Sequence, residues 1–351
     1  MVESMISTGD QHSSVGGHVP VMLSQVLEVM QPRDNGIYVD GTFGGGSYSR
    51  ALLEAADCTV VGIDRDPQAI ERGHDLQADY PDRLILVPGR FSQMKSLLET
   101  LGIEQVDGVT LDVGVSSYQI DDASRGFSFQ ADGPLDMRME GTASDGLSAA
   151  DVVNNLAQKD LASLIYIFGE EKQSRVIAKA IVEARLQKPF MRTSELAALI
   201  ASVVHQNPAK KNLHPATRTF QALRIYVNGE LNELAQGLAA AEAILSEGGH
   251  MAIVSFHSLE DRIVKKFLRQ RCGKTPQGSR HMPPGHEHAN APSFVEIKHR
   301  AMRPDDQEIE LNPRARSARL RAARRTSAAV WPEGESLMHF PEYAGAGSHM
   351  S

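Results

Sequence analysis

The stretch Y-V-D-G-T-F-G-G-G-S-Y-S, residues 38–49, decides the fold. An apolar run ends in Asp40, a turn with four glycines follows, and a helical pattern begins near Ser49. Glycines let the backbone pass close to a ligand, and the amides at a helix start favour polar or anionic groups. The stretch therefore predicts a strand, a ligand-binding turn and a helix.

A second strand is expected from Thr59 to Ile63, and it runs into Asp64. This acid lies about 20 residues after Gly44, the offset at which a carboxylate meets a nucleotide ribose. It favours a nucleoside-cofactor site over a glycine turn that only reverses the chain. The G-x-G-x-x-G pattern of dinucleotide sites is not met, because Ser49 stands at its last position. Asp40 fits an S-adenosyl-L-methionine site better, since its carboxylate can order the turn and receive the ligand's ammonium.

Composition limits the class of protein. The chain has 351 residues, 41% of them hydrophobic, which is enough for one large domain and a smaller one. Only Cys58 and Cys272 occur, so a reducing compartment is expected and no disulfide framework. No apolar run reaches the length of a membrane span. We expect a cytoplasmic protein without a membrane partner.

Charge is unevenly distributed along the chain. The net charge is −8, but three tracts contain Lys or Arg and no acid: residues 207–224, 262–280 and 311–325. Basic tracts are usually solvated faces, yet three of them in an acidic chain favour a segregated phosphate-binding surface.

Strands and helices alternate through the first part of the chain. A helix should open at Asp66-Pro67, and strands are expected at residues 83–87 and 106–111, the latter followed by Asp112. Such alternation predicts a parallel sheet, whose ligands bind at the carboxyl ends of its strands. The loop D-V-G-V-S-S-Y-Q, residues 112–119, would place a carboxylate, two hydroxyls and an amide there. Its position favours a substrate site over an acid that only caps a turn.

The middle of the chain changes to a helix-only pattern, from about residue 147 to 214, with a capping box at Ser148 and Asp151. The sheet pattern then resumes with one helix at about 219–245, a strand at 250–256 and a helix at 259–271. We therefore predict a sheet domain from residues 18–140 and 215–327, an inserted helical domain at 141–214, and disordered tails at 1–17 and 328–351.

Eight segments resemble those of the MraW/RsmH family, in order from residue 18 to 325. They are H-V-P-V-M (18–22), D-G-T-F-G (40–44), D-R-D-P (64–67), L-D-V-G-V-S-S (111–117), R-G-F-S-F (125–129), H-P-A-T-R-T-F-Q-A-L-R-I (214–225), S-F-H-S-L-E-D-R (255–262) and N-P-R-A-R-S (312–317). The resemblance implies an α/β fold, a Rossmann-like class I methyltransferase sheet with an inserted all-helical domain. It also implies S-adenosyl-L-methionine-dependent methylation of N4 of a cytidine in the decoding region of bacterial 16S ribosomal RNA, and suggests a homodimer.

The resemblance also assigns cofactor contacts. They are Gly46, Ser47 and Tyr48 in the glycine turn, Asp64 on the ribose hydroxyls, Phe91 near the adenine, and Asp112 and Gln119 closing the site. The family turn continues Gly-Gly-His where this chain has Gly46-Ser47-Tyr48. Backbone contacts should survive that difference, but a contact from the histidine side chain is in doubt.

The chemistry of N4 methylation points to Asp112 as the catalytic residue. The exocyclic amine of cytosine is a weak nucleophile, because its lone pair is delocalised into the ring. A carboxylate that accepts the amine's hydrogens would turn the lone pair toward the methyl group. Ser116 and Ser117 are secondary acceptors. Methylation at carbon-5 would instead need a cysteine nucleophile, and neither cysteine falls at the end of an expected strand.

The remaining substrate candidates would hold an unstacked cytidine and its RNA. Phe127, Phe129, Tyr118 and Phe256 are candidates to stack on the base, although core packing is the commoner role for any one aromatic side chain. His257 could contact base or phosphate, or be an ordinary loop histidine. Phosphate contacts are expected from Arg218, Arg224 and the arginines of residues 314–325.

Three alternatives stand beside this interpretation. Cys272, His281, His286 and His288 match no zinc spacing, so no metal site is predicted. A nicotinamide-dependent dehydrogenase would share the strand, turn, helix and Asp64. A non-catalytic RNA-binding assembly factor would keep the basic tracts and would not need Asp112.

Overall fold

The computed structural model describes residues 20–141, 144–205, 214–274 and 290–332. Within them a seven-stranded sheet runs in the order β3-β2-β1-β4-β5-β7-β6. Strands β1 to β5 are parallel, whereas β7 is antiparallel to both β5 and β6. The strands are β1 (Ile37–Asp40), β2 (Thr59–Asp64), β3 (Leu84–Pro88), β4 (Val106–Asp112), β5 (Leu245–Ser255), β6 (Phe294–Glu296) and β7 (Arg319–Arg325). The predicted α/β fold with a Rossmann-like sheet is confirmed.

Helices cover both faces of this sheet. They are α1 (Leu23–Met30), α2 (Ser47–Ala55), α3 (Pro67–Asp79), α4 (Met94–Thr100), α11 (Glu230–Ile244) and α12 (Ser258–Arg271). Successive strand residues point to opposite faces, as the pleat requires. Tyr38 packs into the apolar cluster that includes α1 and α2, while Val39 packs into the one that includes α4, α11 and α12. The sheet is therefore buried on both sides, and its ligands must bind at an end of the strands.

Short helical turns lie in the connections. They are η1 (Phe91–Gln93), α5 (Ser117–Asp121), η2 (Ala123–Arg125), α13 (Asp306–Leu311) and η5 (Pro313–Ser317). Two of them follow β3 and β4 directly, so they stand over the carboxyl end of the sheet.

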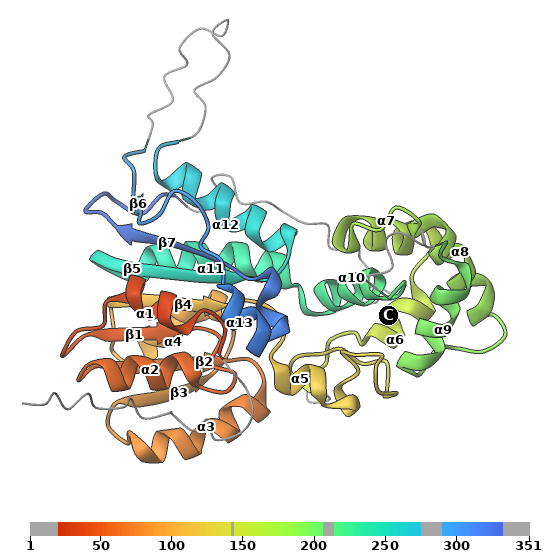
Figure 1. Cartoon of the computed structure of the whole chain (residues 1–351), viewed down its shortest axis with the longest axis horizontal. Helices are drawn as coiled ribbons and strands as arrows, with labels where there is room; N and C mark the ends of the chain where they lie inside the picture. The colour runs from red at the N-terminus through yellow and green to blue at the C-terminus, as the bar shows by residue number, and fades with distance from the viewer. Residues whose placement is uncertain (1–19, 142–143, 206–213, 275–289, 333–351) are drawn as a thin grey trace, which may run out of the picture.

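A group of helices lies beside the sheet in Figure 1. It contains α6 (Ala149–Asn155), α7 (Gln158–Gly169), α8 (Ser174–Arg185) and α9 (Thr193–Val203). The capping box predicted at Ser148 and Asp151 opens α6. The next helix, α10 (Thr217–Asn228), lies along α7, where Gln221 Nε2 donates to the Phe168 carbonyl oxygen at 3.2 Å. Thus α10 packs with the inserted helices. The prediction instead assigns this helix to the sheet domain, whose second segment is expected to start at residue 215. The domain limits stay a prediction.

The single helix predicted at about 219–245 is wrong. The structure has two helices there, α10 and α11, separated by Gly229 at φ +60°. A left-handed glycine is a common helix terminator, because it lacks the Cβ that makes this conformation costly. The break redirects the chain from the inserted helices back to the sheet.

The C-terminal basic tract contains an interior strand, β7, that the sequence analysis did not predict. Arg319 and Arg321 each donate to Asp261 at 2.7 Å, and Arg325 is buried with Nη1 donating to the Ser293 carbonyl oxygen at 3.0 Å. These three side chains stabilise the sheet. Arg321 and Arg325 are largely buried on their partners, which argues against phosphate contacts from them, whereas Arg319 is about 40% exposed and its phosphate contact stays a prediction.

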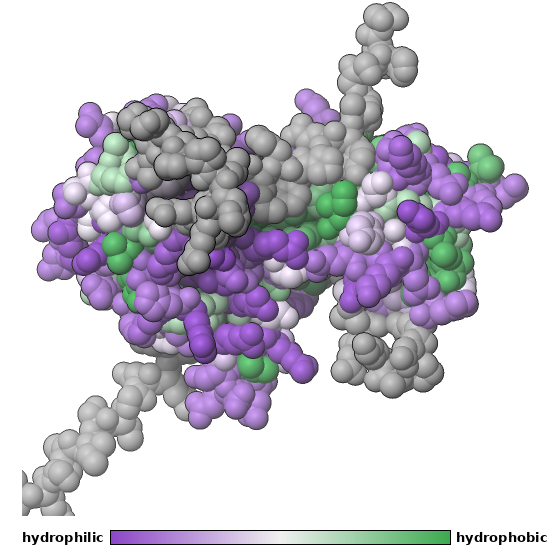
Figure 2. Space-filling view, turned by 90° about the horizontal axis from the view of Figure 1, so that it is seen from above, coloured by the Kyte–Doolittle hydropathy of each residue, from purple (hydrophilic) through white to green (hydrophobic). Residues whose placement is uncertain are grey.

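The predicted tails fall mainly on residues 1–19 and 333–351, which lie outside the described residues, as do His281, His286 and His288. The described end of the chain is packed, since the guanidinium of Arg271 lies 4.5 Å from the Trp331 ring centre. Figure 2 shows a largely hydrophilic face on which apolar residues form separate patches. None of the helices described is both long and apolar enough to cross a bilayer.

Candidate functional site

Asp40 holds the glycine turn through hydrogen bonds to residues on both sides of it. It ends β1 and is buried, with Oδ2 accepting from Ser49 Oγ at 2.8 Å and Oδ1 accepting from the Thr42 amide at 3.4 Å. Burial raises its pKa to about 6, and the two hydrogen bonds act against that rise. Asp40 therefore orders the turn and holds the start of α2 in place, as predicted for this carboxylate.

Asp64 connects the end of β2 to the same turn. Its Oδ2 accepts from the Gly44 amide at 2.7 Å and its Oδ1 from the Asp66 amide at 2.8 Å. Burial raises its pKa to about 6. Each carboxylate oxygen has two lone pairs, so both can accept a further hydrogen bond from a ligand hydroxyl.

The glycine-turn residues differ in what they offer a ligand. Gly46 precedes α2 at φ +73°, which only glycine adopts without strain, and Ser47 is the first residue of α2. Tyr48 turns its side chain inward, where its hydroxyl donates to the Val21 carbonyl oxygen at 2.5 Å. Only the backbone of Tyr48 is therefore available to a cofactor.

Phe91 is held close to the turn by two glycines. A Cβ at Gly237 of α11 would lie 2.3 Å from Phe91 Cδ2, and one at Gly41 would lie 3.0 Å from Phe91 Cβ. The ring thus lies directly against the backbone of α11. This close packing fixes an aromatic side chain at the end of β3, beside Asp64.

Gln119 is held inside the protein. Its Nε2 donates to Asp66 Oδ2 at 2.9 Å, and its Oε1 accepts from the Ser116 amide at 3.0 Å. Arg125 Nη1 donates to the same Asp66 oxygen at 2.9 Å. Asp66 therefore ties the loop after β4 to the loop after β2, and it is a site residue that the sequence analysis used only as a helix start.

Asp112 stands at the carboxyl end of β4. Its amide donates to Thr42 Oγ1 of the glycine turn at 2.6 Å. Its Oδ1 is buried and has no hydrogen-bond partner among the described residues. Burial, with the nearby charges of Asp40 and Glu260, raises its pKa to about 8. Such an oxygen is costly to bury, so it marks a place where a ligand donor fits.

His257 lies in the loop between β5 and α12 and caps that helix. Its Nδ1 accepts from the Glu260 amide at 3.4 Å, and Glu260 Oε2 accepts from the amides of Phe256 at 2.8 Å and His257 at 3.1 Å. His257 Nε2 lies 2.9 Å from Glu260 Oε1 as a charge contact, and among the described residues this buried atom completes no hydrogen bond.

Arg224 and Glu230 form a buried ion pair across Gly229. Arg224 Nε donates to Glu230 Oε1 at 2.8 Å and Nη2 donates to Oε2 at 2.7 Å. Burial would raise the pKa of Glu260, but the contact with the His257 side chain and the charge of Arg224 lower it overall. The charge of Arg224 is already neutralised by Glu230. We therefore retain Arg218, and not Arg224, as the expected phosphate contact.

Three of these side chains have a spacing that a metal could use. Ligand atoms of Glu230, His257 and Glu260 lie within 4.8 Å of one another. However, both oxygens of Glu230 accept from Arg224, whose guanidinium supplies the positive charge at this point. The arrangement therefore does not need a metal ion.

The other substrate candidates lie around this end of the sheet. Ser116 and Gln119 form the capping box of α5, and Ser117 is its first residue. Phe127 is buried in the core, 5.9 Å from the Arg125 guanidinium, so packing accounts for it. Arg218 is about half exposed, and its Nη1 lies 3.7 Å from a carboxylate oxygen of Glu171.

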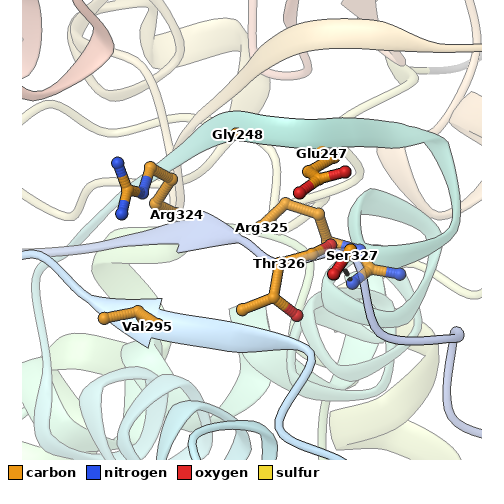
Figure 3. Close-up of a pocket in the computed structure, with 7 residues that line it drawn as sticks. All are labelled: Glu247, Gly248, Val295, Arg324, Arg325, Thr326 and Ser327. Carbon is orange, nitrogen blue, oxygen red and sulfur yellow. Dashed lines mark hydrogen bonds between the residues drawn. The ribbon is translucent and has the colours of Figure 1, made fainter.

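A surface hollow lies away from this site (Figure 3). It is lined by Glu247, Gly248, Val295, Arg324, Arg325, Thr326 and Ser327. Glu247 and Gly248 belong to the first part of β5, whereas Asp112 and His257 follow the carboxyl ends of β4 and β5. The hollow is thus unrelated to the orphan carboxylate, and the carboxyl ends remain the candidate site.

Comparison with known proteins decides the family. The model of the MraW methylase family matches residues 16–326. The chain belongs to the MraW methylase family. Two relatives named ribosomal RNA small subunit methyltransferase H come from Parvibaculum lavamentivorans and Rhodospirillum rubrum. The first is 58% identical over 91% of this chain and 93% of its own length, and the second 53% over 90% and 96%.

The solved rRNA methylase of Streptococcus thermophilus is less similar to this methylase. It has 10% sequence identity and a TM-score of 0.35 over 87% of this chain and 94% of that one, which is too low to support an argument. Membership of a methylase family removes the dehydrogenase alternative. Family membership also agrees with the glycine turn, in which Ser49 stands where a dinucleotide-binding turn would have its last glycine.

Glu260 and Glu230 of this methylase are functional residues that the sequence alone does not predict. For Glu260 a signal existed, because a cap residue followed three positions later by Glu is the spacing of a capping box, and His257 to Glu260 has it. For Glu230 no such signal existed. Its partner Arg224 is six residues away, a spacing that does not bring side chains together on a continuous helix.

Proposed function

We propose that this methylase transfers a methyl group from S-adenosyl-L-methionine to N4 of a cytidine in the decoding region of 16S ribosomal RNA. The observation that carries the proposal is the buried, unpartnered Oδ1 of Asp112 at the carboxyl end of β4. The names of the relatives support a small-subunit ribosomal RNA substrate. Methylation at N4, and the choice of a cytidine in the decoding region, are our proposal.

The site residues fit the cofactor. Asp64 retains acceptor capacity for ribose hydroxyls, and Phe91 offers an aromatic face at the neighbouring strand end. Gly46 and Ser47 offer backbone at the start of α2, while Gln119 is held by Asp66 on the loop after β2. When bound there, S-adenosyl-L-methionine supplies a methyl group activated by its sulfonium.

Asp112 is the catalytic residue of the proposal. Its ionised Oδ1 accepts a hydrogen bond from the cytosine amine, which turns the nitrogen lone pair toward the methyl group, and the carboxylate takes the proton that the amine loses as its nitrogen bonds to the methyl carbon and the carbon–sulfur bond breaks. The positive charge of a bound sulfonium would favour this ionised form. Because Asp112 is anchored to the glycine turn through Thr42, the acceptor is held at the place where cofactor and base must meet. Ser116 and Ser117 line the adjoining turn as secondary acceptors.

The cysteines argue against transfer to carbon-5. That reaction needs a thiolate nucleophile. Burial raises the pKa of Cys58 and of Cys272 to about 11, so both stay protonated at neutral pH. Cys58 precedes β2 and Cys272 follows α12, so neither lies at a carboxyl strand end near Asp112.

The proposal includes the small ribosomal subunit in the cytoplasm as partner and place of action. Arg218 is its phosphate contact, and His257 its contact with the base. A homodimer stays a prediction, which sedimentation of the purified protein would test.

The decisive experiment is nucleoside mass spectrometry. Small subunits lacking the modification are incubated with the protein and methyl-labelled S-adenosyl-L-methionine, and their RNA is digested. We expect labelled N4-methylcytidine, or its 2′-O-methylated form, from the wild type and none from Asp112→Ala, which should still bind the cofactor with reduced affinity. Label on carbon-5 or on another base would refute the proposed chemistry. RNA binding without any label would favour the non-catalytic assembly factor.

A further inference from the structure

Two buried atoms that have no hydrogen-bond partner within the described part of the chain stand at the ends of neighbouring strands. Asp112 Oδ1 is at the end of β4, and His257 Nε2 follows the end of β5. The strands are joined at this end, because Asp112 pairs with Val254 and the Val113 amide donates to the Val254 carbonyl oxygen at 3.0 Å. One pair of adjacent loops therefore presents both unsatisfied atoms.

The hydrogen bonds of the imidazole identify its tautomer. His257 Nδ1 accepts from the Glu260 amide, so its lone pair points there and the proton of the neutral ring is on Nε2. Glu260 Oε1, 2.9 Å from Nε2, favours the same tautomer electrostatically without completing a hydrogen bond. His257 Nε2 is therefore a donor, and Asp112 Oδ1 is an acceptor.

Glu260 connects the two atoms. Its charge acts on Asp112, and a Cβ placed on Gly114, two residues after Asp112, would lie 3.8 Å from Glu260 Oε1. Its other oxygen is held by the amides of Phe256 and His257. The carboxylate thus holds the loop after β5 against the loop after β4.

The ion pair of Arg224 and Glu230 supports Glu260 in turn. Arg224 lowers the pKa of Glu260, and its guanidinium is locked by two hydrogen bonds to Glu230. Glu260, Arg224 and Glu230 are positioning residues, since they act on the base only through His257 and Asp112.

We propose that Asp112 and His257 together read the Watson–Crick edge of cytosine, Asp112 accepting from the N4 amine and His257 donating from Nε2 to ring N3. This inference rests on the proposed function. Cytosine offers a donor at N4 beside an acceptor at N3, which matches the acceptor and donor of the protein. Uracil offers a carbonyl oxygen and an N–H at the same places, so both contacts would be mismatched and two buried polar atoms would stay unpaired.

The test is competition between two kinds of small subunit. Unmodified subunits are the methyl acceptor. The competitor is either a further amount of unmodified subunits or subunits with uridine at the target position. We expect the uridine competitor to bind the wild type at least about tenfold more weakly. In His257→Phe, which keeps a flat ring and loses the donor, the preference for cytidine should shrink but not vanish, because Asp112 still faces the uracil carbonyl oxygen, and KM should change more than kcat. His257→Gln keeps an N–H donor and should restore part of the preference.

Controls separate this inference from the proposed function. His74→Phe, on the exposed surface of α3, should leave the preference unchanged. Each variant is first checked for thermal unfolding and for binding of S-adenosylhomocysteine, and His257→Ala replaces His257→Phe if the latter does not fold. Wild type that labels no cytidine N4 refutes the proposed function. Wild type that labels it, with a folded donor-free variant that keeps the full preference, refutes only the role of His257.

Discussion

Replacing Asp112 by Asn should stabilise the cofactor-free protein against unfolding while greatly slowing methyl transfer, because an amide oxygen can accept the amine's hydrogen bond but cannot take its proton. The pKa of this carboxyl is about 8 in the folded chain against an ordinary 3.8, mainly because it is buried without a hydrogen-bond donor. At pH 7 the unfolded chain ionises Asp112, whereas the folded chain keeps it largely protonated. Folding must therefore take up a proton from solution.

The size of the effect follows from proton linkage. A raised pKa makes the folded state bind more protons than the unfolded state between pH 3.8 and about 8, so the free energy of unfolding falls as pH rises through that window. The fall is about 1.4 kcal/mol for each pH step, which gives about 4 kcal/mol at pH 7 as an upper bound. Asn has nearly the same shape as Asp and does not titrate. The free energy of unfolding of Asp112→Asn should therefore exceed that of the wild type by almost nothing near pH 4, and by an amount that grows to a plateau above pH 8.

Urea unfolding at pH 5, 7 and 8, without cofactor, measures this advantage as the difference in free energy of unfolding. Asp122→Asn is the matched control from the same segment, because hydrogen bonds from Ser124 lower the pKa of Asp122 and removal of that carboxyl should bring no gain that grows with pH. The reasoning is refuted if Asp112→Asn gains nothing at pH 8, or gains as much at pH 5.

Three further changes test the packing around the site. Gly237→Ala would bring a Cβ within 2.3 Å of the Phe91 ring and displace it. Calorimetry on the folded variant should then show S-adenosylhomocysteine binding about tenfold more weakly, a loss of about 1.4 kcal/mol. Unchanged affinity would show that Phe91 does not contact the cofactor. Arg321→Ala should lower the free energy of unfolding by about 1–3 kcal/mol, because it removes a partner of buried Asp261, and leave the salt dependence of RNA binding unchanged. Gly229→Ala should cost about 1 kcal/mol in urea unfolding from backbone strain alone, since apart from the adjoining backbone no described atom lies within 4 Å of the new Cβ; a much larger loss would indicate that the two helices separate there.

The first half of the sheet could be predicted because its signals are local. Strands β1, β2 and β4 are short apolar runs that end in an acid, Asp40, Asp64 and Asp112 respectively. Asp66 caps the helix after β2, as its Asp-Pro pair indicates. The carboxyl ends of parallel strands meet at one edge, so the position of the site followed from the strand pattern.

The rest depended on contacts that are distant in sequence. β7 reads as a basic tract, because only Leu320, Ala322 and Ala323 of its seven residues are apolar, and the acid that neutralises Arg319 lies 58 residues earlier. The sequence shows the charge of an arginine but not its partner, and the same limit applies to Arg224. The orphan state of Asp112 and His257 likewise depends on which groups fail to reach them, and only the folded chain shows that.

The position of β7 has a consequence for how the chain folds as it is made. β5 pairs with β4 on one side and with β7 on the other, yet β7 is synthesised long after β5. Until residues 319–325 leave the ribosome, β5 has one open edge, and the loop with His257 extends from a strand that has only one neighbour. The nascent chain should therefore need protection from aggregation at this edge, and a chain cut short before β7 should aggregate even though the glycine turn, Asp64 and Asp112 are all present.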